Sequence, residues 1–205
     1  RVLKLFYSLS KVSFILLAML SIPVIIEINY ILHLWLGDSI PDYTIQFTIF
    51  VLVNMVISSL NTPVSQVVHA TGKMKLYQIG TSTMVCAILP ASWIFLKLGF
   101  DPVSVYWVSL IITIINQYVC NLLLRRIYTY SLMEYSIKVI IPCVLFSILV
   151  PIPPYIITTL IPSSFLRLLI TGCISVVTSV AVSYLFVLDK SEKQIVLSFI
   201  KRKKV

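Results

Sequence analysis

Six long apolar runs, separated by short polar loops, constrain this 205-residue chain more than any other feature. A helix needs about 20 residues to cross the hydrocarbon core of a bilayer. With 59% apolar and only 11% charged residues, the chain has too few charges to solvate a globular domain of this size. The pattern predicts an all-α, polytopic transmembrane helix bundle as a single domain, with spans over about residues 12–36, 43–70, 76–97, 102–124, 136–150 and 166–188.

The fifth run differs from the others because it holds five prolines, namely Pro142, Pro151, Pro153, Pro154 and Pro162. Proline removes a backbone donor and interrupts a helix. We therefore expect a helix from about residue 136 to 149, followed by an irregular outer loop that dips into the interface. A re-entrant segment is the alternative.

Basic residues give the orientation of the spans. If the N-terminus is cytoplasmic, all of the 16 Lys and Arg residues except Lys97 and Arg167 lie on the cytoplasmic side. The positive-inside rule then places both ends in the cytoplasm, including a basic tail at 189–205. The same bias explains the isoelectric point of about 9.5, so nucleic acid is not an expected partner. The bilayer itself is the first partner.

The residues that catalysis or metal binding requires are missing from the sequence. Each of the four cysteines falls inside a predicted span, without the spacing of metal ligands or of a redox pair. No phosphate-binding loop, nucleophile elbow or zinc-protease motif occurs. We therefore expect neither an enzyme nor a bound cofactor or metal.

Polar side chains cluster inside two spans. In the second span Asn54, Ser58, Asn61 and Ser65 share one helical face, with Gln66, Thr62 and His69 beside it. The fourth span carries Thr113, Asn116, Gln117, Cys120 and Asn121. These groups either make hydrogen bonds between packed helices or line a water-accessible path for a polar solute. The candidate path residues are Asn54, Ser58, Asn61, Gln66, Asn116 and Gln117.

Glu27 is the sole carboxylate well inside a predicted span, at ten residues from Gly37. A charge at roughly 15 Å of depth along a helix is costly, so this side chain should face a cavity or a partner, or be protonated. It is a candidate site of proton or cation coupling or of substrate contact. A hydrogen bond that packs two helices is the alternative. Prolines inside four spans, Pro23, Pro63, Pro90 and Pro142, are typical of kinked transporter helices.

Three segments resemble one family: ILHLWLGDSIP at 31–41, NTPVSQVVHATGKMKLYQ at 61–78, and LKLGFDPVSV at 96–105. They are similar to the C-terminal half of Wzx-type polysaccharide flippases, in the superfamily of multidrug, oligosaccharidyl-lipid and polysaccharide exporters. The resemblance covers about residues 4–142 and is most specific at ATGK, 70–73, followed by Tyr77 and Gln78. The last two spans match only in hydrophobicity and position.

The resemblance implies two lobes of helices around a central cavity in the bacterial inner membrane. Such a protein moves undecaprenyl-diphosphate-linked oligosaccharides to the outer leaflet by alternating access. This chain would supply the C-terminal part of the fold, and most or all of the first lobe and part of the second would lie outside it. Lipid-linked oligosaccharide and other membrane proteins of polysaccharide assembly are the implied partners. Four basic residues at the cytoplasmic rim either set topology or capture the diphosphate, namely Lys73, Lys75, Arg125 and Arg126.

Three alternatives to a flippase remain open. A multidrug cation antiporter of the same superfamily would favour several carboxylates in its cavity, and the spans hold one. A membrane enzyme would need a larger polar loop than any between the spans. A membrane scaffold subunit explains the bundle but leaves the two amide-rich spans without a role.

Overall fold

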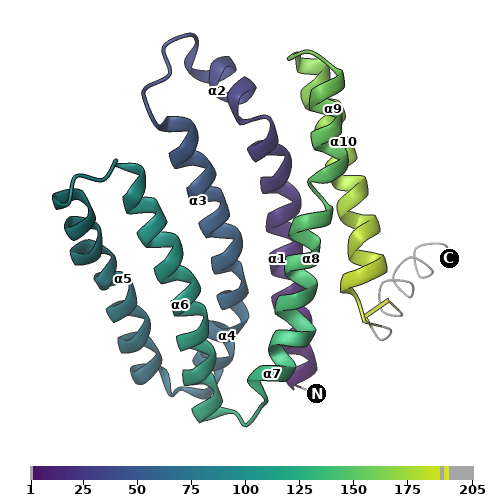
Figure 1. The fold of residues 1–205 in the computed structure, drawn as a ribbon. Coiled ribbons are helices and arrows are strands. Elements are labelled where there is room, and N and C mark those ends of the chain that lie inside the picture. The colour runs from purple at the N-terminus through teal and green to yellow at the C-terminus, as the bar shows by residue number, and fades with distance from the viewer. Residues whose placement is uncertain (1, 190–191, 194–205) are drawn as a thin grey trace.

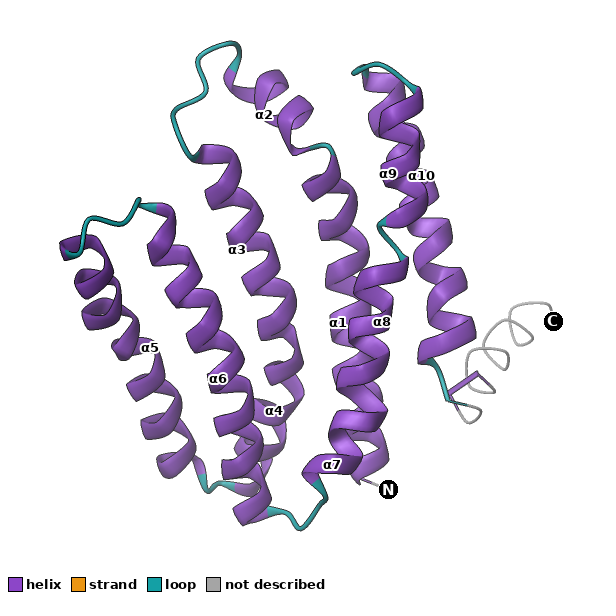
Figure 2. Cartoon of the chain, viewed as in Figure 1, coloured by secondary structure: helices purple, strands orange, loops and turns teal. Residues whose placement is uncertain are grey.

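The chain is mostly helical over residues 2–189 and 192–193, the part that the computed structural model describes (Figures 1 and 2). No strand occurs in these two ranges. The α-helices are α1 (Val2–Ile26), α2 (Ile28–Leu36), α3 (Thr44–Ser58), α4 (Thr62–Thr71), α5 (Met74–Lys97), α6 (Val103–Ile127), α7 (Leu132–Tyr135), α8 (Ile141–Leu149), α9 (Ile152–Leu160) and α10 (Phe165–Val182). A 3-10 turn, η1 (Ser59–Asn61), joins α3 to α4, and π-helical turns occur at η2 (Ser136–Ile140) and η3 (Ser183–Val187).

Within the described residues, six helical segments are long and apolar enough to cross a membrane. They are Leu3–Ile26, Thr44–Thr71, Met74–Lys97, Val103–Ile127, Leu132–Leu160 and Phe165–Val187. Large apolar side chains such as Leu89, Val177 and Leu185 are exposed on their outer surfaces, where only lipid would tolerate them in such number. The prediction of an all-α, polytopic bundle is confirmed, and the chain is a multi-pass membrane protein.

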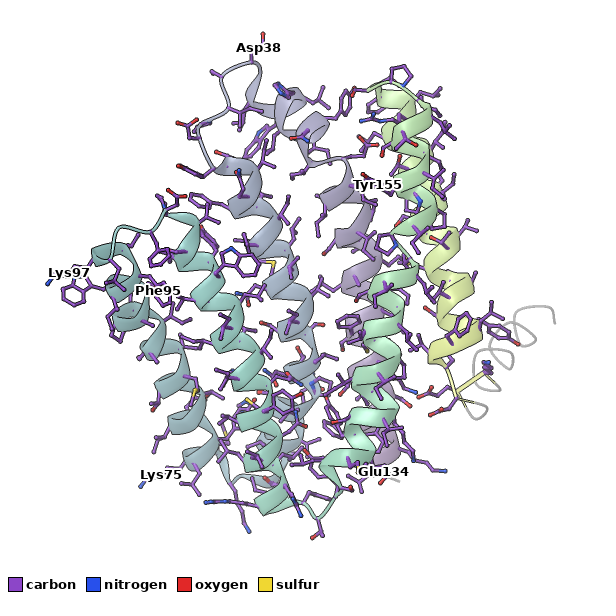
Figure 3. The ribbon with its side chains drawn as sticks, viewed as in Figure 1. Asp38, Lys75, Phe95, Lys97, Glu134 and Tyr155 are labelled. Atoms are coloured by element: carbon purple, nitrogen blue, oxygen red, sulfur yellow. The ribbon has the colours of Figure 1, made fainter. Side chains whose placement is uncertain are left out.

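Neighbouring spans run in alternating directions, so the loops collect at two ends (Figure 1). The Asp38 end holds the loops at 37–43, 98–102 and 161–164, and the Lys75 end holds those at 72–73 and 128–131 (Figure 3). In Figure 1, α5, α6, α3 and α1 lie in a row, with α8 and α10 beside α1. Lys97 and Arg167 lie toward the Asp38 end, while Lys4, Lys73, Lys75, Arg125, Arg126 and Lys138 lie toward the Lys75 end.

The first span does not cover residues 12–36 as expected. The helix already begins at Val2 and is interrupted at Glu27, where φ is −98° and ψ is 15°. Beyond that residue α2 bends away from the axis of α1 (Figure 1). Hydropathy could not locate this break because apolar residues flank Glu27 on both sides. Nor could it extend the span toward the N-terminus, because Lys11 looked like a loop residue.

The irregular loop expected after residue 149 is also wrong. The helix is interrupted only at Val150 and Pro151 and resumes as α9, which continues to the Asp38 end without re-entering (Figure 1). Pro153 and Pro154 stand in the first turn of α9, where the missing N–H has no helical partner to lose. The prolines therefore start a helix here. The other four spans agree with their predicted bounds to within a few residues.

Aromatic rings close the core at the Lys75 end. The ring of Tyr135 stacks on that of Phe6, with centroids 5.4 Å apart, and Tyr130 packs edge-on against both. The hydroxyl of Tyr130 donates to the side-chain oxygen of Asn121 at 2.8 Å. Burial raises the pKa of Tyr130 far above its ordinary value, so its phenol stays neutral and keeps donating. These contacts form a packed aromatic cluster at this end of the bundle.

Candidate functional site

A stripe of polar side chains runs along the outward face of the second span. Ser58, Thr62, Gln66 and His69 are all exposed and follow one another at helical spacing from the middle of the span to its Lys75 end. We call these four residues the polar stripe. The same face carries Val51 and Met55 in the half nearer the Asp38 end.

The opposite face of the same span is apolar. Val53, Val56, Ile57 and Leu60 line an internal cavity of about 530 Å³. With 3.6 residues per turn, these positions lie roughly half a turn from the polar stripe. The second span therefore separates an apolar interior from a polar outer surface.

Exposed polar groups at this depth need a partner. In hydrocarbon, a hydroxyl, amide or imidazole without a hydrogen bond costs several kcal/mol, about 4 or more on the cyclohexane scale. Spans consequently direct such groups toward water-filled cavities or toward other protein. The polar stripe is thus a surface that either water or another part of a membrane assembly covers.

Asn54, predicted to line a path, is instead occupied in helix packing. Its Nδ2 donates to the hydroxyl of Ser109 at 2.9 Å, and its Oδ1 accepts from the hydroxyl of Thr113 at 2.7 Å. Both partners are on α6. This geometry is the interhelical hydrogen bonding that was the alternative for these amides.

The other candidate path residues separate into different environments. Ser58 and Gln66 belong to the polar stripe, whereas Asn61 is half-buried and its Oδ1 has no donor among the described residues. Asn116 accepts a weak hydrogen bond from the Cys120 thiol at 3.7 Å. Gln117 is buried and lines the internal cavity. The six residues are not brought together around one space within the described chain.

Glu27 is buried at the α1–α2 junction, where it has a charged partner. Its Oε2 lies 2.6 Å from Nη2 of Arg167, and its Oε1 accepts from the hydroxyl of Thr171 at 3.1 Å. A second guanidinium nitrogen of Arg167 donates to the carbonyl of Ile161 at 3.2 Å. Glu27 therefore lies at the end of the first span rather than deep within it. Sequence reasoning missed Arg167 because the two residues are 140 positions apart.

Lys11 forms a second buried ion pair, which the sequence did not reveal. Its Nζ lies 2.6 Å from a carboxylate oxygen of Glu192 and 3.2 Å from one of Asp189, and it donates to the carbonyl of Val187 at 3.3 Å. The hydroxyl of Ser8 also donates to Glu192. Lys11 is only 1% exposed. These contacts supply a partner for its buried charge. Lys11, which its charge had placed in a loop before the first predicted span, therefore lies within that span.

The two ion pairs hold the same helices together. Lys11 and Glu27 are separated by roughly 24 Å along α1, and both find their partners on or next to the α10–η3 segment. Between them, the fully buried small side chains of Thr171, Ser175 and Ser179 lie along α10, the helix that packs on α1. Small residues let membrane helices approach closely. The arrangement is a packed seam with an ion pair at each end.

The ATGK segment forms the turn at the Lys75 end. Gly72 adopts φ of 71° and its N–H donates to the carbonyl of His69, which ends α4 in the left-handed conformation that glycine favours. The four basic residues proposed for diphosphate capture are all exposed at this end, namely Lys73, Lys75, Arg125 and Arg126. We call these four residues the basic rim. They lie at the end of the bundle where the polar stripe ends.

Comparison of the chain with protein-family models, with curated proteins and with solved structures finds no match.

Proposed function

We propose that this protein is part of a bacterial inner-membrane flippase that moves lipid-linked oligosaccharides from the cytoplasmic to the outer leaflet by alternating access. In this proposal the Lys75 end is cytoplasmic. The protein carries out transport and no covalent chemistry, and the carried unit is an undecaprenyl-diphosphate-linked sugar.

The polar stripe is the observation that carries the proposal. Sugars need hydrogen-bonding groups along their whole route across the hydrocarbon core. Ser58, Thr62, Gln66 and His69 supply hydroxyl, amide and imidazole groups over half of a span, on a surface that the described helices leave open. A second lobe facing this surface would complete a wet cavity between the two lobes.

The basic rim supports the same direction of transport. Lys73 and Lys75 follow His69 after the Gly72 turn, so cationic groups stand beside the end of the polar stripe. A diphosphate at the inner leaflet would meet these charges first. The sugars attached to it would then face the polar stripe.

A multidrug cation antiporter has less support from the same geometry. Binding a cation in the membrane calls for an unpaired carboxylate, but Glu27 is already paired with Arg167 and hydrogen-bonded to Thr171. The internal cavity has no charged residue among its described lining. A scaffold subunit would fit the packed α1–α10 seam but gives the polar stripe no role.

The test compares Ser58→Leu and Gln66→Leu with Met55→Leu in the full-length protein. Met55 lies on the same outward face but outside the polar stripe, so its replacement puts a leucine on this face without removing a hydrogen-bonding group. We expect the first two variants to reduce surface polysaccharide at least severalfold at unchanged membrane abundance, because they remove hydrogen-bonding groups from a wet route. The control should export normally.

The same variants can also reject the proposal. If the polar stripe faces lipid, leucine should raise membrane abundance and leave surface polysaccharide unchanged, since it removes unsatisfied polar groups from hydrocarbon. If the polar stripe only binds a partner protein, abundance and export should fall together.

A further inference from the structure

The short helix α2 stands apart from the rest of the first span. It is joined to α1 through Glu27, whose φ of −98° and ψ of 15° lie in the sparsely populated bridge region of backbone conformations. Beyond Glu27 the chain turns away from the axis of α1 (Figure 1). Hinges are typically a few residues at the ends of elements that absorb such a change in φ and ψ. Glu27 thus has the backbone geometry of a hinge.

The packing of α2 against the bundle is light. Of its nine residues two are buried, Ile28 and Leu32, whereas Leu34 and Trp35 are 63% and 78% exposed. Few buried apolar contacts are typical of segments that open locally at low cost. Among the described residues, the polar side-chain contacts that hold this segment to other spans all come from Glu27 at its base. A small number of contacts therefore keeps α2 in place.

Arg167 makes the charged contact from an anchored position. It lies in the first turn of α10, where the hydroxyl oxygen of Ser164 accepts its backbone N–H at 3.2 Å. Its guanidinium donates to the carbonyl of Ile161 at 3.2 Å and lies 2.6 Å from the Glu27 carboxylate. Since α9 and α10 pack against each other, Arg167 is fixed on a helical hairpin, while Glu27 belongs to the base of α2.

An ion pair of this kind can open at a small cost in free energy. Desolvation of the two ions offsets most of their attraction, so they lose little when both return to water. Glu27 and Arg167 lie at the Asp38 end of the first and sixth spans, and the side chain of Arg167 is 12% exposed. Buried apolar side chains have no such alternative, because entering water is unfavourable for them. The pair therefore holds α2 and can also release it.

The helix α2 adjoins the Asp38 end of the internal cavity. The lining of the cavity reaches Ile26 on α1, one residue before Glu27, and includes Val53 on α3. Both of these helices pack against α2. A movement of α2 about Glu27 would therefore uncover this end of the cavity.

We propose that α2 is a hinged lid at the Asp38 end of the internal cavity, with Glu27 as its hinge and the Glu27–Arg167 ion pair as the latch that keeps it closed. The lid opens when the two ions separate and enter water. The inference concerns a movement of the chain and does not depend on what the protein transports.

Distances between two spin labels can follow the lid in lipid nanodiscs. One label would be attached at Leu34→Cys on α2 and the other at Val177→Cys on α10, both of which are exposed positions. The exposed Cys86 and Cys173 would first be replaced by serine. Leu34 stands roughly 10 Å along the helix from Glu27, so a swing of about 30° would move it about 5 Å. The wild-type protein should show a single distance.

Two variants of Arg167 release the latch. Arg167→Glu places a second carboxylate beside Glu27, and we expect a second population in which the distance between the labels differs by about 5 Å or more. Arg167→Met removes the cation without adding repulsion, and it should give the same shift in a smaller fraction of molecules. The charge swap Glu27→Arg/Arg167→Glu should restore the single distance, because it forms the pair again.

Two controls separate the lid from a general loss of stability. Lys11→Glu creates the same kind of repulsion with Glu192 at the other end of the α1–α10 seam, and it should leave the lid distance unchanged. Labels at Met55→Cys and Val177→Cys report on two spans outside the lid, and their distance should be the same in every variant.

Four results would each overturn the proposal. They are an unchanged lid distance in both Arg167 variants, an equal shift in Lys11→Glu, a shift of the Met55–Val177 distance together with the lid distance, and a charge swap that leaves the lid open.

Discussion

At the residue scale, the ionised groups inside this bundle are paired. Glu27 and Arg167 are both largely buried, with Arg167 12% exposed at its side chain, and they form a 2.6 Å contact. Desolvation of each ion opposes their attraction, so the pair as a whole adds little stability. Removing one member, however, leaves the other charge buried without a partner.

We therefore expect Glu27→Leu or Arg167→Leu alone to lower the free energy of unfolding by about 3 kcal/mol, and the double variant to recover most of that loss. Unfolding in mixed micelles would measure the free energy of unfolding of each variant. Lys138→Gln is the matched control, since its pair with Glu134 is half exposed and should matter little. Additive losses in the double variant would contradict a direct pair.

The same double variant addresses coupling by Glu27. If the pair only packs helices, a stable double variant in the full-length protein should still export. If it is stable and inactive, the Glu27–Arg167 pair has a role in transport beyond packing.

At the element scale, α5 depends on α6 for most of its packing. In Figure 1 it stands at the edge of the row, and few of its side chains are buried. Gly80 lies at a close contact between α5 and α6. A Cβ added there would lie 2.7 Å from Cδ1 of Leu123. Gly172 on α10 has no atom within 4 Å of the corresponding position.

Alanine at these two glycines should differ in its effect on stability. Gly172→Ala should stabilise the protein by up to about 1 kcal/mol through helix propensity. Gly80→Ala gains the same propensity but must displace the end of the Leu123 side chain, so its net gain should be smaller. Thermal unfolding of both variants measures the difference, and equal stability would contradict the close α5–α6 contact.

At the scale of the whole molecule, the charges mark the two ends of the bundle. Two basic residues, Lys97 and Arg167, lie toward the Asp38 end among the described residues, and all others with a described position lie toward the opposite end or within the α1–α10 seam. The basic tail at 201–204 lies outside the described residues. This asymmetry predicts which end faces the cytoplasm.

Single cysteines at Asp38 and Asp101 should react with an impermeant thiol reagent in intact cells, and those at Lys73 and Arg126 only after permeabilisation. Cys86 and Cys173 are exposed and would first be replaced by serine. The reverse labelling pattern would show that the assigned orientation is wrong.

The sequence alone determined the properties that depend on local composition. The number of spans, the boundaries of four of them, the positions of most loops and the separation of charges follow from runs of apolar residues and from single basic side chains. Tertiary structure alone decided which buried groups meet. The ion pairs of Glu27 with Arg167 and of Lys11 with Glu192 join residues more than a hundred positions apart, and no local pattern contains that information. The same holds along the second span, where periodicity placed Asn54 and Ser58 on one face. Packing against α6 then engaged the Asn54 amide in hydrogen bonds and left Ser58 exposed, because a neighbouring helix covers only part of a span.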